Sequence, residues 1–158
     1  MKLDNRDAGL ICGHSVVGAL GADAVNGAVT GLVWGRPGSL TNGPLFDQLC
    51  EEVAGYFAGT RVQFTVPLAP RGSAFQQRFY TALCAIPYGE TRTYGDLAKS
   101  LNVSAQAIGQ ACGANPIAVL IPCHRVLAAN GLGGYSGEGG IEAKVALLRL
   151  EGAAGLLI

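Results

Sequence analysis

The chain has 158 residues, of which 49% are hydrophobic, and this is enough apolar material for one packed domain or two small ones. The apolar runs are short and no charged leader precedes one, so we expect no membrane span and no secretion signal, and we predict a cytoplasmic protein. The net charge of zero excludes a protein that coats nucleic acid by charge alone.

Residues 1–69 are predicted to form a small sheet-and-helix domain. Apolar stretches at 10–12, 16–20 and 29–34 predict short strands, and Asn26-Gly27 is a typical hairpin turn. Apolar residues at fourfold spacing predict a helix over 45–57, with acidic residues 47, 51 and 52 on its other side. Residues 61–68 alternate as in a strand. The apolar positions of the helix are Leu45, Leu49, Val53 and Phe57.

The five cysteines are unevenly spaced and include no C-x-x-C pair, which favours reduced thiols over a disulfide framework. Cys12, His14 and Cys50 could bind a metal together, but no second pair has ligand spacing. We therefore predict no metal site.

Residues 70–158 are predicted to form a second, mainly helical domain, joined through the linker 69–72. A capping box at Ser73 begins a helix of about thirteen residues, a second capping box at Thr93 begins a helix over 94–101, and Ser104 begins one over 105–113. The two short helices at 94–113 have the spacing of a helix-turn-helix, although a plain helical hairpin has the same lengths. This domain carries seven Lys/Arg against five Asp/Glu, so any contact with phosphates should come from here.

The stretch NPIAVLIPCHR carries the candidate chemistry. Residues 117–121 are continuously apolar and predict a short strand buried on both faces, which Pro122 ends. Cys123, His124 and Arg125 follow as a nucleophile, a base and a cation, and positive charge or a base nearby lowers a thiol pKa. The alternative is a buried structural cysteine beside a surface histidine.

A C-terminal helix is predicted over 141–151, and Glu151 is the next position on its apolar face. A buried carboxylate needs partners. Glu151 could orient the His124 imidazole, or it could form an ion pair with Arg125 or Arg149. The apolar face is formed by Ile141, Val145 and Leu148.

The motif PCHRV after an Asn-Pro turn resembles the active site of the O6-alkylguanine-DNA alkyltransferases, the methylated-DNA–protein-cysteine methyltransferases. The resemblance continues through FQQRFYTALCAIPYGETRTYGDLA before the motif and GLGGYSGEGGIEAKVALLRLEG after it, and covers residues 70–152. It implies an α/β (α+β) fold, with a small N-terminal β-sheet/helix domain and a mainly helical C-terminal domain that holds a helix-turn-helix.

The resemblance also implies roles for five catalytic residues. Cys123 accepts the alkyl group, and His124 and Glu151 form a relay that activates the thiol. Asn115 hinges its turn to the active site, with local turn chemistry as the alternative. Tyr94 donates a hydrogen bond to guanine N3 as the base leaves, although a packed aromatic with a satisfied hydroxyl is the more ordinary reading.

Further residues are implied at the substrate and at DNA. The glycine-rich stretch 131–140 walls the guanine pocket, or else is a mobile linker. In the family an arginine of the second short helix replaces the flipped-out nucleotide, and here Gln106 stands in its place without a cation. We therefore expect Gln106→Arg to tighten duplex binding. The substrate-binding residues are Ser136, Tyr135, Gly134, Lys144 and Arg125, and the DNA-binding residues are Gln106, Ala105, Ala107, Gly109 and Thr93.

The function implied is direct, single-turnover repair of O6-alkylguanine, and of O4-alkylthymine, in double-stranded DNA by a monomer without cofactor. Two other functions remain open. One is a lesion-recognition or regulatory DNA-binding module in which Cys123 is inert or a sensor. The other is a cysteine hydrolase, for which a histidine directly after its cysteine is awkward.

Overall fold

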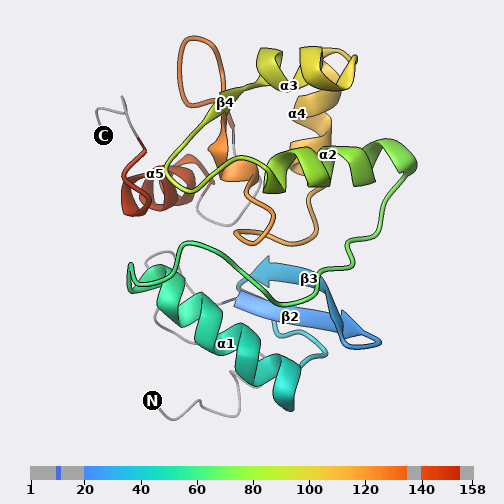
Figure 1. Cartoon of the computed structure of the whole chain (residues 1–158), viewed down its shortest axis with the longest axis vertical. Coiled ribbons are helices and arrows are strands. Elements are labelled where there is room, and N and C mark those ends of the chain that lie inside the picture. Colours follow the sequence, from blue (N-terminus) through green and yellow to red (C-terminus); the bar gives the residue numbers. More distant parts are fainter. Residues whose placement is uncertain (1–9, 12–19, 135–139, 154–158) are drawn as a thin grey trace. The chain divides into compact units, whose positions relative to one another are not determined.

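The computed structural model describes residues 10–11, 20–134 and 140–153, and the chain divides between Arg71 and Gly72 into two compact units. The first unit holds a three-stranded sheet and one helix, and the second holds four helices and a two-stranded ladder among its described residues (Figure 1). This mixed architecture confirms the predicted fold class. The predicted boundary, after residue 69, lies two residues before the division.

The sheet of the first unit is antiparallel and has the order β1-β2-β3, with β1 at Leu10–Ile11, β2 at Leu20–Val25 and β3 at Ala28–Trp34. Asn26 and Gly27 have φ of 51° and 78°, the left-handed values that a tight hairpin turn needs, so the predicted turn is confirmed. The strand predicted at 16–20 lies mostly outside the described residues.

Helix α1, Pro44–Phe57, buries Leu49, Val53 and Phe57 as predicted. The placement of Glu52 on the exposed side was wrong, because its side chain is buried at 2% exposure. The Glu52 carboxylate accepts hydrogen bonds from the Thr65 N–H at 2.6 Å and the Val66 N–H at 3.3 Å. This burial fixes the chain segment that follows the helix.

The strand predicted over 61–68 is wrong, because the buried Glu52 carboxylate binds backbone N–H groups of this segment. The backbone donors at 65 and 66 bind Glu52 in place of a ladder, and Pro67 has no N–H to donate. Only Leu68 forms an isolated bridge, with Val29 as its partner.

The helices of the second unit begin where their caps predict. Helix α2, Ala74–Cys84, starts after a complete capping box at Ser73, and α3, Tyr94–Leu101, after one at Thr93. Asn102, in the left-handed conformation, ends α3, and Ser104 caps α4, Ala105–Gly113. These three helices lie together in Figure 1, with α5, Gly140–Leu150, on the other side of the ladder of β4 and β5. The parallel ladder pairs β4, Arg92–Thr93, with β5, Val126–Leu127.

The predicted strand over 117–121 is wrong, although its burial is confirmed. The segment forms tight turns, with Ile121 N–H donating to the Ile117 carbonyl at 3.1 Å. Val119 adopts φ of 69°, a conformation that β-branched residues rarely take. The backbone at the two ends of this segment does not need a neighbouring strand, because the Asn115 side chain forms hydrogen bonds with the Ile117 N–H and the Ile121 carbonyl.

Helix α5 turns a different face inward than predicted. Ile141 is 41% exposed and Val145 half-buried, whereas Lys144 and Leu148 are buried. Lys144 takes a core position because three carbonyl oxygens accept its ammonium protons. Glu151 is buried, as predicted, one residue beyond the helix. Within the described ranges, no helix is both long and apolar enough to cross a bilayer.

Candidate active site

Cys123 opens a single 3-10 turn, η2 (Cys123–Arg125), immediately after Pro122. Its side chain is buried at 6% exposure. Burial raises the pKa of the Cys123 thiol, while a hydrogen bond from Asn115 and the charge of Lys144 act in the opposite direction. The sequence-based expectation of a lowered thiol pKa was therefore wrong, because desolvation outweighs the neighbouring donors. The resting side chain is a thiol that needs a base.

Asn115 joins the turn before the apolar segment to its end. Its Nδ2 donates to the Ile121 carbonyl at 2.8 Å, and its Oδ1 accepts from the Ile117 N–H at 3.1 Å. The same side chain is hydrogen-bonded to Cys123. One amide therefore closes the turn and reaches the sulfur, which confirms the local turn chemistry, while the hinge role that the resemblance implies stays a prediction.

His124 lies wholly buried beside Glu151. Its Nε2 is 2.7 Å from Glu151 Oε2, and its Nδ1 has no hydrogen-bond partner among the described residues. Because the carboxylate accepts a hydrogen bond from Nε2–H, the neutral ring carries its proton on Nε2 and its lone pair on Nδ1. Burial lowers the pKa of His124 and the hydrogen bond and charge of Glu151 raise it, with a net lowering. A neutral imidazole is thus available as a base.

Glu151 also binds Arg125, so two readings of this carboxylate that the sequence left as alternatives are both present. Arg125 Nε lies 2.8 Å from Oε1 and Nη2 lies 3.0 Å from Oε2, a two-pronged contact that fixes the carboxylate plane. The third arm of the guanidinium donates to the Ile86 carbonyl at 2.7 Å. The guanidinium group of Arg125 therefore donates its hydrogen bonds to Glu151 and Ile86 within the protein.

Lys144 is fully buried and holds the glycine-rich stretch to β5. Its Nζ donates to the carbonyls of Val126 at 2.6 Å, Leu132 and Gly134 at 3.0 Å. Three acceptors use all three ammonium protons. Lys144 was predicted to bind the substrate, but its ammonium group contacts backbone carbonyl oxygens of the protein.

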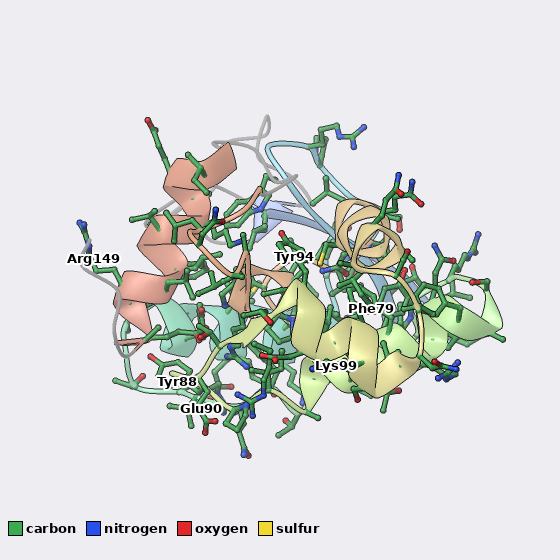
Figure 2. The ribbon with its side chains drawn as sticks, turned by 90° about the horizontal axis from the view of Figure 1, so that it is seen from above. Phe79, Tyr88, Glu90, Tyr94, Lys99 and Arg149 are labelled. Atoms are coloured by element: carbon green, nitrogen blue, oxygen red, sulfur yellow. The ribbon has the colours of Figure 1, made fainter. Side chains whose placement is uncertain are left out.

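Tyr94 begins α3 and turns toward the same cluster, with Lys144 Nζ 5.9 Å from its ring centre (Figure 2). Burial raises the pKa of its phenol, the nearby Cys112 thiol also raises it, and a hydrogen bond with the Gly134 backbone lowers it. The phenol stays protonated at neutral pH, as a hydrogen-bond donor must. Tyr94 and Gly134 are therefore brought together.

Two residues of this cluster were missed from the sequence. Gly133 has φ of 70°, and a Cβ there would lie 2.8 Å from Tyr94 Cε2, so only glycine lets the loop cover the ring. Cys112 of α4 interacts electrostatically with Cys123, and burial raises its own pKa to about 12. The glycine could have been suspected within its glycine-rich run, but no sequence signal distinguished Cys112 from a packing cysteine.

Helix α4 carries the residues predicted at DNA. Its Ile108 and Ala111 are buried, while Ala105, Gln106 and Gly109 are exposed. A Cβ built on Gly109 would meet no atom within 4 Å, so no internal packing requires glycine there. Ala107 is half-buried, and Thr93 is engaged in the α3 capping box. The exposed face therefore consists of small residues together with the Gln106 side chain.

Some predicted positions have no structural account. Tyr135 and Ser136, and the cysteine and histidine at 12 and 14, lie outside the described residues. Across the part of the chain that the structure describes, no three His, Cys, Asp or Glu side chains are grouped for a metal.

Comparisons with known proteins converge on one family. Residues 74–153 match the family model described as 6-O-methylguanine DNA methyltransferase, DNA binding domain. The methylated-DNA–protein-cysteine methyltransferase of Methanosarcina acetivorans is 46% identical over 115 residues, which are 71% of this chain and 72% of the relative. That of Mycolicibacterium paratuberculosis is 46% identical over 119 residues, 73% and 71% of the two chains.

Solved structures agree. The Mycobacterium tuberculosis OGT protein in complex with DNA superimposes with a TM-score of 0.76 at 41% identity, covering 86% of this chain and 88% of that one. An O6-methylguanine DNA methyltransferase of Methanococcus jannaschii gives a TM-score of 0.64 at 26% identity, covering 89% and 92%. From the matched domain, the identities and the shared fold, the chain belongs to the methylated-DNA–protein-cysteine methyltransferase family.

Proposed function

We propose that this protein repairs O6-alkylguanine in duplex DNA, and O4-alkylthymine as well, by moving the alkyl group to Cys123. The observation that carries the proposal is the group of four residues formed by buried Cys123, half-buried Asn115 and the buried His124–Glu151 pair, in the unit that also bears α4. The reaction needs no cofactor, and the protein acts on DNA in the cytoplasm. A monomer contains every residue invoked.

Activation of the thiol follows from the charges around it. Proton transfer from Cys123 to His124, directly or through a water, leaves a thiolate and an imidazolium, and Glu151 stabilises the imidazolium at 2.7 Å. Nδ1 is the nitrogen free to receive that proton, because Nε2 is bonded to the carboxylate. The Asn115 amide and the Lys144 charge then stabilise the anionic sulfur.

In the transfer itself, the Cys123 sulfur forms a bond to the alkyl carbon as the bond from that carbon to guanine O6 breaks. The departing electron pair stays on the base, where a hydrogen bond from the Tyr94 phenol to guanine N3 stabilises the developing negative charge, and the proton that His124 took from Cys123 neutralises the base as it leaves. The protonated state of Tyr94 at neutral pH supports this role. The product is a thioether without a good leaving group, so each molecule reacts once.

Arg125 and Lys144 receive positioning roles within this proposal in place of direct contact with the substrate. Arg125 fixes Glu151 by two bonds, and Lys144 ties the glycine-rich stretch to β5. The backbone near Gly134 is then left to contact the guanine, and the substrate-binding roles that the resemblance implies for residues 135 and 136 stay predictions, because both lie outside the described residues.

DNA contact is assigned to α4. The exposed Ala105 and Gly109, with half-buried Ala107, offer a surface of small residues that fits the narrow minor groove, and the longer Gln106 side chain is exposed beside them. The open space at Gly109 speaks against packing as the reason for this composition. Gln106 fills the gap left by an extruded nucleotide, and Thr93 lies where α3 begins.

The test is intact-mass spectrometry after incubation with a duplex that contains O6-methylguanine, using Cys123→Ser as the control. We expect one added methyl on the parent, mapped to Cys123, and none on the variant. A parent of unchanged mass that still binds the duplex would leave only a lesion-binding module. Repeated turnover of a thioester or amide would instead establish a hydrolase.

A further inference from the structure

The β-turn Pro87–Glu90 lies against the end of α5, where Glu151 is held. The Glu90 N–H donates to the Pro87 carbonyl at 3.0 Å, and Gly89 takes φ of 83° at the third position, where such a turn favours glycine. Figure 2 shows Tyr88 beside the C-terminal end of α5. The turn is therefore a closed unit whose two middle residues lie against the end of α5.

Each middle residue of the turn makes its own contact there. The Tyr88 hydroxyl donates to the Leu150 carbonyl at 3.2 Å, and the Gly89 N–H donates to Glu151 Oε1 at 3.4 Å. The Tyr88 ring lies 5.8 Å from the Arg125 guanidinium carbon, and Ile86, just before the turn, accepts from Arg125. The turn thus touches both Glu151 and the arginine that grips it.

Glu151 needs such support because of where it stands. It follows the last residue of α5, and the final carbonyls of a helix have no partner within the helix. The Tyr88 hydroxyl satisfies one of these carbonyls directly before Glu151. A Cβ on Gly89 would come within 3.2 Å of the Glu151 carbonyl oxygen, so the backbone approach is close.

We propose that the turn Pro87–Glu90 is a positioning element for alkyl transfer, in which Tyr88 and Gly89 hold Glu151 where it orients His124. This inference rests on the proposed function. Neither residue touches the substrate. Their effect passes through the Glu151–His124 hydrogen bond to the proton acceptor of Cys123.

Two variants test the turn from different sides. Tyr88→Phe keeps the ring under Arg125 and removes only the hydroxyl, and Gly89→Ala adds a methyl group at a strained φ beside Glu151. Gly59→Ala is the matched control, because Gly59 has φ of 78° and no atom within 4 Å of a built Cβ. The control imposes the same backbone strain far along the sequence from the turn.

We expect the single-turnover transfer rate at saturating duplex to fall about fivefold in Tyr88→Phe, the size of one lost hydrogen bond, and further in Gly89→Ala. Duplex affinity should stay at the parent value in both. The His124 ring signals, followed by NMR against pH, should titrate at lower pH in both variants, because a loosened Glu151 favours the imidazolium less. The chain has two histidines, so His14→Gln assigns the signals.

Equal saturating rates and an unchanged His124 titration in Tyr88→Phe would overturn the inference, even if Gly89→Ala fails to fold. An equal loss in Gly59→Ala would also overturn it, since strain alone would then explain the effect. A parent that never methylates would count against the proposed function alone, because the histidine titration can still be measured.

Discussion

Among the described residues, each unit of this protein buries one glutamate, and the two carboxylates differ in what surrounds them. Glu52, at 2% exposure, accepts hydrogen bonds from neutral donors, the backbone and hydroxyl of Thr65, the Val66 N–H and the Gln48 amide. Glu151, at 5% exposure, faces an imidazole and a guanidinium. Neutral donors can only hold a chain segment in place, whereas a titratable partner lets a carboxylate influence a proton. Burial of a charge alone therefore does not mark an active site.

The largest effect should come from Glu151→Gln. The amide cannot stabilise an imidazolium, so we expect the single-turnover transfer rate to fall about 100-fold. Arg125 would also lose its buried counter-charge, and the free energy of unfolding should fall by about 3 kcal/mol. Quenched-flow transfer and urea unfolding measure the two effects. Glu142→Gln, at an exposed position of α5, the helix that precedes Glu151, is the control and should change neither.

Glu52→Gln should separate stability from chemistry. The NH2 group of the glutamine amide cannot accept hydrogen bonds from the Thr65 and Val66 N–H groups, so the free energy of unfolding should drop by about 2 kcal/mol. The transfer rate per folded molecule should equal that of the parent, with Glu51→Gln as the exposed neighbour for comparison. A slowed transfer in well-folded Glu52→Gln would break the distinction between the two carboxylates.

The two sites should also respond to acid in different pH windows. Burial raises the pKa of Glu52, but its hydrogen bonds lower the pKa by more, so the pKa in the folded protein lies below its ordinary value of 4.5. A depressed carboxyl pKa stabilises the fold above the unfolded pKa, and this contribution is lost as pH falls below about 4.5. The pKa of His124 is lowered from 6.5, so the unfolded chain binds its proton first and stability falls from about pH 6.5 downward.

Urea unfolding of the parent across this pH range should show both losses. Glu52→Gln should flatten the lower window and keep the upper one, and His124→Gln should do the reverse. If either variant flattened both windows, the two sites would be coupled.

Sequence reasoning located the caps and the chemistry better than the strands. Ser73, Thr93 and Ser104 were predicted as helix starts because a cap is a local hydrogen bond between near neighbours in the chain. The strand predictions over 61–68 and 117–121 were wrong because side chains occupy the backbone hydrogen-bonding groups. In the first segment this is the distant Glu52, and in the second it is the nearby Asn115. Apolar pattern predicts burial, but it does not predict which partner satisfies the backbone.

The same limit applies to the active site. Cys123, His124 and Glu151 were foreseen because of their motif and the family resemblance, and the link between His124 and Glu151 is present at 2.7 Å. The Arg125–Glu151 ion pair was one of the alternatives that the sequence left open, but the contacts of Arg125 and Lys144 with the carbonyls of Ile86, Val126 and Gly134 could not be foreseen. Those carbonyls carry no sequence signal.

The smallest effect should come from a position that touches neither carboxylate. Gln106 is exposed on α4, and Gln106→Arg adds a cation next to the proposed DNA path. We expect the dissociation constant for a duplex to fall about threefold at moderate salt, and the salt dependence of log K to steepen by about one counterion. Fluorescence anisotropy across a salt series measures both.

Gln77→Arg adds the same charge on the exposed side of α2 and is the matched control. If tightening came from net charge alone, both variants would bind alike, whereas insertion beside an extruded nucleotide favours only Gln106→Arg. A lesion-containing duplex, whose damaged base is easier to extrude, should enlarge the difference between them. Unfolding free energies equal to the parent in both variants would show that the change in DNA affinity does not arise from a change in stability, on which both buried glutamates act.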